Sequence, residues 1–355
     1  MGLTDLTIRN FRNIAALDLE LPEAGAVIIG GNGQGKTNLL EGIYYLVLFR
    51  SFRGAHDREL VRFDTPGFFV AGSSRGRVTA GYEVAGKRKK VTIDRAPVHR
   101  LASAVGHVVA VAFSPADRQL VSGGPAVRRR YLDVLLSLSD SGYLAALSAM
   151  RAALKQRNAA LRLGREDAAR AFDEPFAAAA DQITAARARW VDRWAPRFST
   201  ICSDMGEQGV ALMQYYNQSG ANDPSVDLRQ QLVVAVDRDL RRGATTVGPH
   251  LDDLRLVLGG RTMRAYASAG QQRTAAIALR LIEAETLAEA TGQMPIGLYD
   301  DVFAELDPGR QANLLRLIRD TMPGQAIVTA PRDAEVPQEL FDRPRWTMTG
   351  GTIEQ

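Results

Sequence analysis

The chain has 355 residues, of which 46% are hydrophobic and 24% charged, and its formal net charge is only +4. This composition is ordinary for a globular protein of two or three domains, with a mild preference for anionic partners. The single cysteine, Cys202, excludes an intrachain disulfide and a cysteine-rich metal site, and no apolar run near the start is long enough to cross a membrane. We therefore expect a cytoplasmic protein without membrane contact.

The chain is expected to begin with two paired strands, over residues 3–9 and 16–21. In the second of them, Leu17, Leu19 and Leu21 alternate with acidic residues, which is typical of a half-buried strand. The stretch Arg9–Asn13 between the strands fits a tight polar turn and a nucleotide-facing loop equally well.

A short apolar strand over residues 26–29 then leads into a glycine-rich loop that is followed by a helical pattern. The loop consists of Gly30, Gly31, Asn32, Gly33, Gln34, Gly35, Lys36 and Thr37, the G-x-x-x-x-G-K-[ST] spacing of a phosphate-binding loop. Its glycines let backbone N–H groups surround phosphate oxygens, and the helix start adds partial positive charge. Lys36 is expected to reach the β- and γ-phosphates, and Thr37 to offer its hydroxyl to Mg²⁺. The alternative is a glycine-rich turn with a chance Gly-Lys-Thr.

Residues 50–100 are the most basic part of the chain, with 12 Lys or Arg and 5 Asp or Glu. Residues 78–84 and 87–93 predict a β-hairpin whose second strand opens with four cations, Lys87, Arg88, Lys89 and Lys90. Period-2 alternation places Lys87 and Lys89 on the face of Val91, with Arg88 and Lys90 opposite. Such a hairpin could lie along a DNA backbone, or it could be a solvated edge strand protected by lysines.

Residues 115–245 predict a compact, mostly helical lobe. Helices are expected from Pro125 to about Leu136, over residues 143–163, and from Arg170 until Pro196 ends the last one. Too few heptads repeat for an extended coiled coil. Three consecutive arginines in the first helix fan over about 200°, so they cannot all face one partner; they are Arg128, Arg129 and Arg130.

The last part of the chain returns to strands and carries two further candidate site elements. Residues 265–272 open a long helix, in which Ser268 and Gly270 suggest a second anion site or an ordinary helix cap. A buried strand over residues 295–299 ends in Asp300, which should hold Mg²⁺ directly or through water, and Asp301, which is placed to activate the attacking water.

These stretches resemble the RecF family, SMC-like ATP-binding-cassette (ABC) ATPases of bacterial recombinational DNA repair. Ser268–Gln272 is similar to the signature motif, and Asp300-Asp301 with Ala304–Asp307 is similar to Walker B and the D-loop. The middle region, the Gly-Pro-His stretch and the opening turn also fit the family; they are Phe113–Asp117, Gly124–Asp133, Gly248–Leu254 and Ile8–Asn13.

The resemblance implies an α/β fold, an ABC-type ATPase head with a mixed sheet made of residues 1–114 and 246–355. Residues 115–245 would be the inserted helical lobe. It implies ATP and Mg²⁺ as cofactors, and a head-to-tail homodimer in which Ser268, Gly270 and Gln271 act in trans, with Asp307 in the D-loop. It also implies binding to single- and double-stranded DNA at gaps and junctions, partnership with RecR and RecO, and loading of RecA.

Several positions depart from the patterns of related families. Leu251 replaces the usual Arg of the Gly-Pro-His stretch, Thr329 stands where transporters have a switch histidine, and Asp301 is shorter than the usual catalytic Glu. Leu251 argues against a charge role for the Gly-Pro-His stretch. The other two departures, together with the lack of an evident Q-loop glutamine, favour a slow ATPase used as a switch. The alternative is the ATP-binding subunit of an ABC transporter, which shares the main motifs but needs that glutamine.

Overall fold

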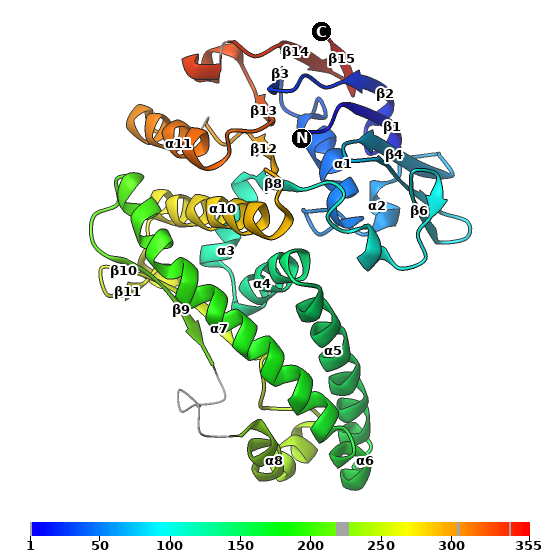
Figure 1. Cartoon of the computed structure of the whole chain (residues 1–355), viewed down its shortest axis with the longest axis vertical. Coiled ribbons are helices and arrows are strands. Elements are labelled where there is room, and N and C mark those ends of the chain that lie inside the picture. Colours follow the sequence, from blue (N-terminus) through cyan, green and yellow to red (C-terminus); the bar gives the residue numbers. More distant parts are fainter. Residues whose placement is uncertain (1, 218–226, 304–305, 341) are drawn as a thin grey trace. The chain divides into compact units, whose positions relative to one another are not determined.

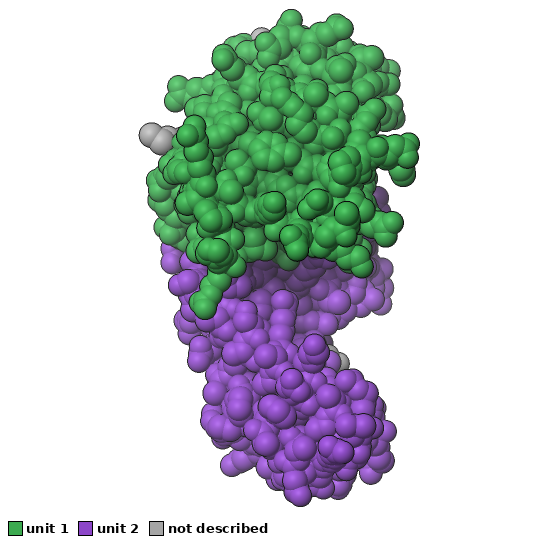
Figure 2. All heavy atoms as spheres, turned by 90° about the vertical axis from the view of Figure 1, so that its right-hand side faces the viewer, with its two compact units in different colours: residues 1–117, 279–355 green, residues 118–278 purple. Residues whose placement is uncertain are grey.

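The computed structural model describes residues 2–217, 227–303, 306–340 and 342–355 (Figure 1). The chain forms two compact units, residues 1–117 with 279–355 (unit 1) and residues 118–278 (unit 2), coloured separately in Figure 2. The domain boundaries predicted from sequence, at residues 114/115 and 245/246, follow composition and motifs rather than contacts, and they stay predictions.

The first sheet of unit 1 is antiparallel, with strand order β2-β1-β4-β5-β6-β7. Its strands are β1 Asp5–Phe11, β2 Ile14–Glu20, β4 Gly67–Ser73, β5 Arg77–Glu83, β6 Arg88–Ile93 and β7 Ala96–Pro97. The expected first pair forms, with Leu6 opposite Leu19 and Ile8 opposite Leu17. The expected hairpin is β5–β6, and β7 pairs with β6 only at Thr92 and Ile93.

The second sheet of unit 1 carries the expected glycine-loop strand in a mostly parallel arrangement, β15-β14-β3-β13-β12-β8. Its strands are β3 Gly25–Ile29, β8 Ala110–Phe113, β12 Ile296–Asp300, β13 Ala326–Ala330, β14 Arg345–Thr349 and β15 Thr352–Glu354. Because β3, β13 and β12 are parallel neighbours, their carboxyl ends lie at one edge of the sheet. Thus the chain following β3, residue Thr329 of β13 and the end of β12 come together.

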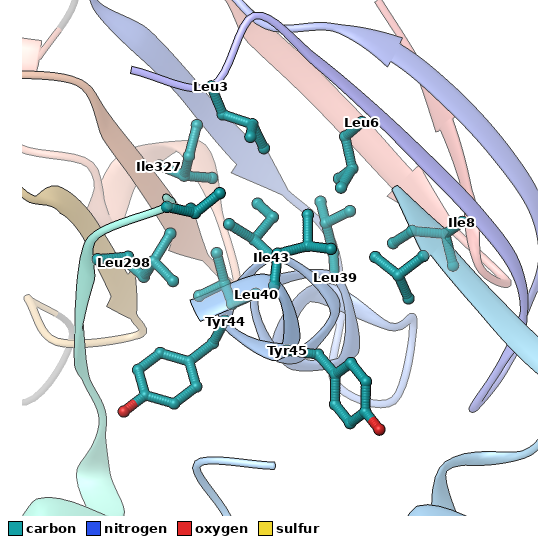
Figure 3. Close-up of a cluster of buried hydrophobic side chains, with 14 of the residues drawn as sticks. Leu3, Leu6, Ile8, Leu39, Leu40, Ile43, Tyr44, Tyr45, Leu298 and Ile327 are labelled. Atoms are coloured by element: carbon teal, nitrogen blue, oxygen red, sulfur yellow. The ribbon is translucent and has the colours of Figure 1, made fainter. Parts of the chain in front are cut away.

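Helix α1, Lys36–Leu48, joins the two sheets of unit 1 into one core. Its buried Leu39, Leu40 and Ile43 lie among side chains of both sheets, as Figure 3 shows. Gly42 permits a close approach, because a Cβ there would lie 2.8 Å from Ile8 Cδ1. Full burial of each large apolar side chain contributes roughly 1.5–3 kcal/mol, so the core fixes the helix that follows the glycine loop.

Short helices and one long helix complete unit 1. They are α2 Asp57–Leu60, α11 Pro308–Thr321, the C-terminal part of α10 Ala269–Thr291, and four 3₁₀ turns at Leu101–Ala104, Pro115–Asp117, Asp333–Glu335 and Gln338–Leu340. The points where the chain leaves and re-enters unit 1 are tied by an ion pair, because Arg280 donates to the Asp117 carboxylate at 2.6 Å.

Unit 2 is mostly helical, as expected. Its helices are α3 Arg118–Ser122, α4 Pro125–Ser139, α5 Ser141–Arg162, α6 Glu166–Arg170, α7 Asp173–Asp204, α8 Leu228–Arg242 and α9 Met263–Tyr266. Its three-stranded sheet has the order β11-β10-β9, with β9 Ala211–Tyr216, β10 Asp253–Leu258 and β11 Arg261–Thr262. Among the described residues no extended coiled coil occurs.

The prediction that Pro196 ends its helix is wrong, since α7 continues to Asp204. A proline inside a helix removes one backbone hydrogen bond and crowds the preceding turn. Here buried side chains on both sides of the proline, Trp194 and Phe198, are anchored in the unit, and burial outweighs the local cost.

The Gly-Pro-His stretch is an organising element of unit 2. Arg187, almost fully buried, donates to the Pro249 carbonyl at 2.8 Å, and Arg129 donates to the Asp252 carbonyl at 2.7 Å. Asp253 receives both ends of the Arg128 guanidinium, at 2.8 and 2.9 Å. Two of the three consecutive arginines are therefore structural, whereas Arg130 is exposed, in agreement with the expected fanning.

Candidate functional site

The glycine loop has the backbone conformation that a phosphate cradle needs. Gly33 and Gly35 have φ of 79° and 113°, a region that favours glycine. A Cβ at Gly35 would also lie 2.8 Å from the Asn13 side chain. Gly35 caps α1 without any side-chain hydrogen bond, so the first N–H groups of the helix have no side chain satisfying them.

The Lys36 ammonium lies inside this loop. It is only 4% exposed and donates to the Gly30 carbonyl at 2.7 Å and the Gly31 carbonyl at 3.2 Å. The two carbonyls accept two of the three N–H bonds of the ammonium group, and its positive charge has no anionic partner among them. The remaining charge and N–H group fit an anionic ligand bound in the same loop.

The Walker B carboxylate meets the loop directly, although the two are 263 residues apart in the chain. The Thr37 hydroxyl lies 2.8 and 2.9 Å from the two oxygens of Asp300. Burial raises the pKa of Asp300, and the nearby Asp301 charge adds to this, while the Thr37 and Thr329 hydroxyls and Lys36 oppose it. A hydroxyl and a carboxylate are the oxygen ligands that Mg²⁺ takes from the protein in phosphate-loop proteins, so the pair fits such a cation.

Asp301 lies beside this pair in an unusual backbone conformation, with φ of 50°. Its N–H donates to the Thr329 hydroxyl oxygen at 3.1 Å, and its carboxylate lies 3.2 Å from the same oxygen. Thr329 is 1% exposed, and in the sequence it stands out only as the residue in place of the transporter histidine. Its hydroxyl also lies 3.2 Å from Asp300, so it touches both adjacent carboxylates.

The opening turn, which the sequence fits equally well as a tight polar turn or a nucleotide-facing loop, contacts the glycine loop. Asn13 donates to the Gln34 carbonyl at 3.0 Å, and Asn38 donates to Asn13 at 2.8 Å. Arg12 holds the buried Glu41 through two hydrogen bonds, at 2.9 and 3.1 Å. The sequence offers one signal for this contact. A polar turn, with residues that tolerate positive φ, precedes the strand that leads into the glycine loop.

A cavity of about 680 Å³ is lined in part by this turn. It is lined by Arg12, Asn13, Asn38, Arg58, Glu59, Val61, Arg62, Phe63, Asp64, Thr65 and Val84. Phe63 is 93% exposed, so an aromatic ring, two amides and three guanidinium groups border one volume next to the first turn of α1.

Ser268, Gly270 and Gln271 lie at the start of α10, in unit 2. The structure places a break at Ala267 and Ser268 between α9 and α10, rather than one helix from residue 265. Ser268 Oγ accepts from the Gln271 N–H at 3.2 Å, and the Gln271 side chain accepts from the Ser268 N–H at 2.9 Å. This reciprocal pair is a capping box, so two N–H groups of the helix start, those of Ser268 and Gln271, are satisfied within the chain.

Of the D-loop stretch, Ala304 and Glu305 lie outside the described residues. Asp307 is exposed and caps α11 by accepting from the Arg310 N–H at 3.0 Å. This residue thus has a local capping role, alongside the role implied by the motif.

The four cations of the hairpin face different surroundings. Lys87 has φ of 46° and lies in the turn before β6, so it does not take part in the strand alternation. Lys89 faces inward, where its ammonium lies 2.9 Å from the Asp57 carboxylate and 5.3 Å from the Tyr45 ring centre. Lys87, Arg88 and Lys90 are exposed, and within the described residues their side chains form no ion pair or hydrogen bond.

These residues fit a nucleoside triphosphate with a divalent cation. The loop offers backbone donors and a buried ammonium, and Thr37 with Asp300 offers two oxygen ligands. No group of three or more His, Cys, Asp or Glu side chains able to hold a metal occurs among the described residues. A cation here would therefore need oxygen ligands from a phosphate as well, which is how Mg²⁺ binds in phosphate-loop proteins.

Comparison with known proteins defines the class. A family model described as "RecF/RecN/SMC N terminal domain" matches residues 2–341. The head domain of Smc from Pyrococcus furiosus shares the fold, with a TM-score of 0.57 at 14% identity over 99% of this chain and 95% of that chain. The chain is an SMC-like, ABC-type ATPase head in α/β form.

Full-length relatives identify the family within this class. A curated protein from Geobacter sulfurreducens, named "DNA replication and repair protein RecF", is 35% identical over 90% of both chains. One of the same name from Lactobacillus delbrueckii subsp. bulgaricus is 36% identical over 100% of this chain and 98% of its own. A solved structure of the recombination mediator RecF with ATP, in the RecFOR pathway, matches with TM-score 0.90 and 30% identity over 99% of this chain and 97% of that chain. The chain belongs to the RecF family of DNA replication and repair proteins.

No helix in the part of the chain that the structure describes is long and apolar enough to span a membrane.

Proposed function

We propose that this chain is an ATP-operated DNA clamp of the RecF type, in which ATP binding closes a head-to-tail homodimer on DNA and slow hydrolysis opens it. The observation that carries the proposal is the contact between Thr37 and Asp300, at 2.8 Å, because it joins a complete phosphate loop to a Walker B carboxylate in one folded site. The similar solved structure of RecF with ATP supports the choice of nucleotide.

In this proposal the loop from Gly30 to Thr37 holds the phosphates, with Lys36 as the main cation and Thr37 and Asp300 as ligands of Mg²⁺. The bound cation would neutralise charge on the β- and γ-phosphates. Asp301 would orient and deprotonate the attacking water. The cavity bordered by Asn38 and Phe63 is the proposed place for the nucleoside, since it adjoins the first turn of α1 and offers an aromatic ring and amides.

The second half of each site would come from another copy of the chain. Ser268, Gly270 and Gln271 would approach the γ-phosphate of the opposite copy, with Asp307 nearby as the D-loop residue. The capping box explains why this half does not need a ligand in the single chain. We place the functional boundaries where the motifs lie: residues 1–114 and 246–355 as the head and 115–245 as the inserted lobe.

DNA would be contacted by the exposed hairpin cations Lys87, Arg88 and Lys90, on a surface separate from the core. Lys89 is left out of the proposed DNA contacts because the Asp57 carboxylate pairs with its ammonium. Its proposed role is to stabilise the hairpin. The RecFOR pathway named for the similar structures supports RecR and RecO as partners. The proposed role is loading of RecA at gaps and duplex–single-strand junctions, in the cytoplasm.

Sedimentation of the purified protein, with and without ATP and a gapped duplex, tests this proposal. We expect a monomer without nucleotide, a dimer with ATP, and a larger DNA-bound species when both are present. A protein that stays monomeric with ATP and DNA would contradict the clamp. ATP-dependent association with membranes that DNA does not affect would favour the transporter alternative.

A further inference from the structure

Thr329 is a buried polar side chain at the carboxyl end of the second sheet, 1% exposed, at the position where transporters have a switch histidine. It lies on β13, the strand between the one preceding the glycine loop and the one ending in Asp300. Its hydroxyl oxygen lies within 3.4 Å of four polar atoms: the Asp301 nitrogen, one carboxylate oxygen each of Asp300 and Asp301, and the Tyr299 carbonyl.

The hydroxyl has one proton and two lone pairs, so it cannot serve all four atoms as a donor. The Asp301 N–H must donate to it, since an amide nitrogen cannot accept. The single hydroxyl proton then goes to one of three acceptors, namely Asp300 at 3.2 Å, Asp301 at 3.2 Å or the carbonyl at 3.4 Å. Because Thr37 already donates to Asp300, the Asp301 carboxylate is the acceptor that depends most on Thr329.

The backbone at Asp301 depends on this contact. Its φ of 50° is in the left-handed region, which is strained for a residue with a Cβ. A part-buried N–H without an acceptor would add a further penalty. Thr329 supplies that acceptor, and with the same atom it reaches the carboxylate of the residue it holds.

We propose that the Thr329 hydroxyl is a positioning group, which fixes Asp301 in its left-handed conformation and holds its carboxylate beside Asp300. In this role it prepares the hydrolytic step without touching the nucleotide. The inference rests on the proposed ATPase function. Thr329 is thus a positioning residue. It occupies the position of the transporter histidine, but a hydroxyl has a different chemistry from an imidazole.

The test compares Thr329→Val, which keeps the shape and removes the hydroxyl, with Thr329→Ser, which keeps the hydroxyl. Thr286→Val is the matched control, because Thr286 is also buried but donates its hydroxyl to the Ile282 carbonyl at 2.8 Å, within α10. Each variant is measured for folding by its melting curve, for ATP affinity, for the rate of hydrolysis, and for hydrogen exchange of the Asp301 amide in nucleotide-free protein.

We expect Thr329→Val to lower kcat by about 10- to 100-fold, the range for residues that orient a metal or catalytic ligand, with ATP affinity changed less than about threefold. Thr329→Ser should restore most of kcat. The Asp301 amide should exchange faster in Thr329→Val than in the wild type, the Ser variant and the Thr286 control.

A Thr329→Val protein with wild-type kcat and unchanged Asp301 exchange would overturn the inference while leaving the ATPase proposal intact. Equal loss of kcat in the Ser variant would also overturn it, since packing rather than the hydroxyl would then matter. If the wild type itself neither bound nor hydrolysed ATP, the proposed function would fail, and the positioning role would fail with it.

Discussion

Two helix starts in this chain have the same kind of sequence, small residues before an apolar helix, but different chemistry. At α1 the cap is Gly35, no side chain bonds the first N–H groups, and Lys36 lies inside the loop. At α10 the Ser268 and Gln271 side chains satisfy the helix start in a reciprocal pair. The first is open to an anion as it stands, whereas in the second two of the N–H groups are already paired within one chain.

In the proposed clamp, this difference would let one chain bind ATP without closing. The open start can hold a nucleotide in a single copy, whereas the capped start would contribute only when another copy brings a phosphate near enough to compete with the capping box. Net gains from single hydrogen bonds are about 1 kcal/mol, so exchange of a cap for a phosphate is a small step in either direction. A reversible clamp needs such a balance.

The largest effect is expected from Lys36→Met, which removes the cation of the open helix start. ATP affinity should fall by at least about 100-fold, equivalent to ~2.7 kcal/mol, and dimerisation should be lost with it. Titration with a fluorescent ATP analogue measures the change. Lys155→Met on the exposed face of α5 is the control, and comparable loss in both variants would remove the special role of the loop lysine.

The next effect concerns the capped start. Ser268→Ala should leave ATP binding by the monomer intact and weaken ATP-dependent dimerisation, seen by light scattering. Asp140→Ala removes a comparable cap, since Asp140 accepts from the Gly142 N–H at 2.7 Å at the start of α5. Both changes should cost about 1 kcal/mol of stability, but only the first should affect dimerisation. Equal dimerisation defects in the Ser268→Ala and Asp140→Ala variants would mean that Ser268 acts only as a structural cap.

The hairpin offers a third, surface-charge test outside both helix starts. Reversing Lys87, Arg88 and Lys90 to Glu should weaken DNA binding and reduce the slope of log K against log salt by up to about 0.9 for each lost phosphate contact. Lys89→Met should instead lower stability, because it leaves Asp57 without its ion pair. Filter binding over a salt series separates the two, and unchanged slopes would return the hairpin to an edge-protecting role.

The smallest expected effect is on the stability of the protein, through Asp300 beside the open helix start. Since burial raises the pKa of Asp300, the folded state favours its protonated form, and the ionised carboxylate lowers stability as pH rises through the raised pKa. Asp300→Asn should therefore raise the melting temperature at pH 8 by about 2–4 °C, equivalent to about 1 kcal/mol. The gain should shrink as the pH is lowered toward the usual Asp range. A lower melting temperature of Asp300→Asn at pH 8 would contradict the conclusion that burial raises the pKa of Asp300.

Much of the open site could be predicted from sequence because its parts are local. A strand, a glycine loop and a helix are contiguous, and an apolar strand that ends in Asp300 has its own signature. The contact between Thr37 and Asp300 also follows, once parallel strands place their ends at one edge. The sequence suggested the family as well, through several motifs at once, and the full-length comparisons confirm it.

The remainder depends on side-chain contacts that no spacing encodes. Lys89 looked equivalent to its neighbours, yet it lies against Asp57 and Tyr45. Pro196 looked like a helix end, yet buried rings on either side carry α7 past it. Thr329 gains its contacts only because β13 lies between two strands that are distant in the chain.

The central claim is that the open start of one copy works with the capped start of another. The most direct measurement mixes two inactive variants, Lys36→Met and Ser268→Arg, and follows ATP-dependent dimerisation and hydrolysis. Each mixed pair contains one intact composite site, the phosphate loop of the Ser268→Arg copy facing the unaltered Ser268 of the other. We expect that neither variant alone forms an ATP dimer and that the mixture does, with hydrolysis regained. A Ser268→Arg protein that dimerises with ATP as well as the wild type, or a mixture no more active than its parts, would contradict it.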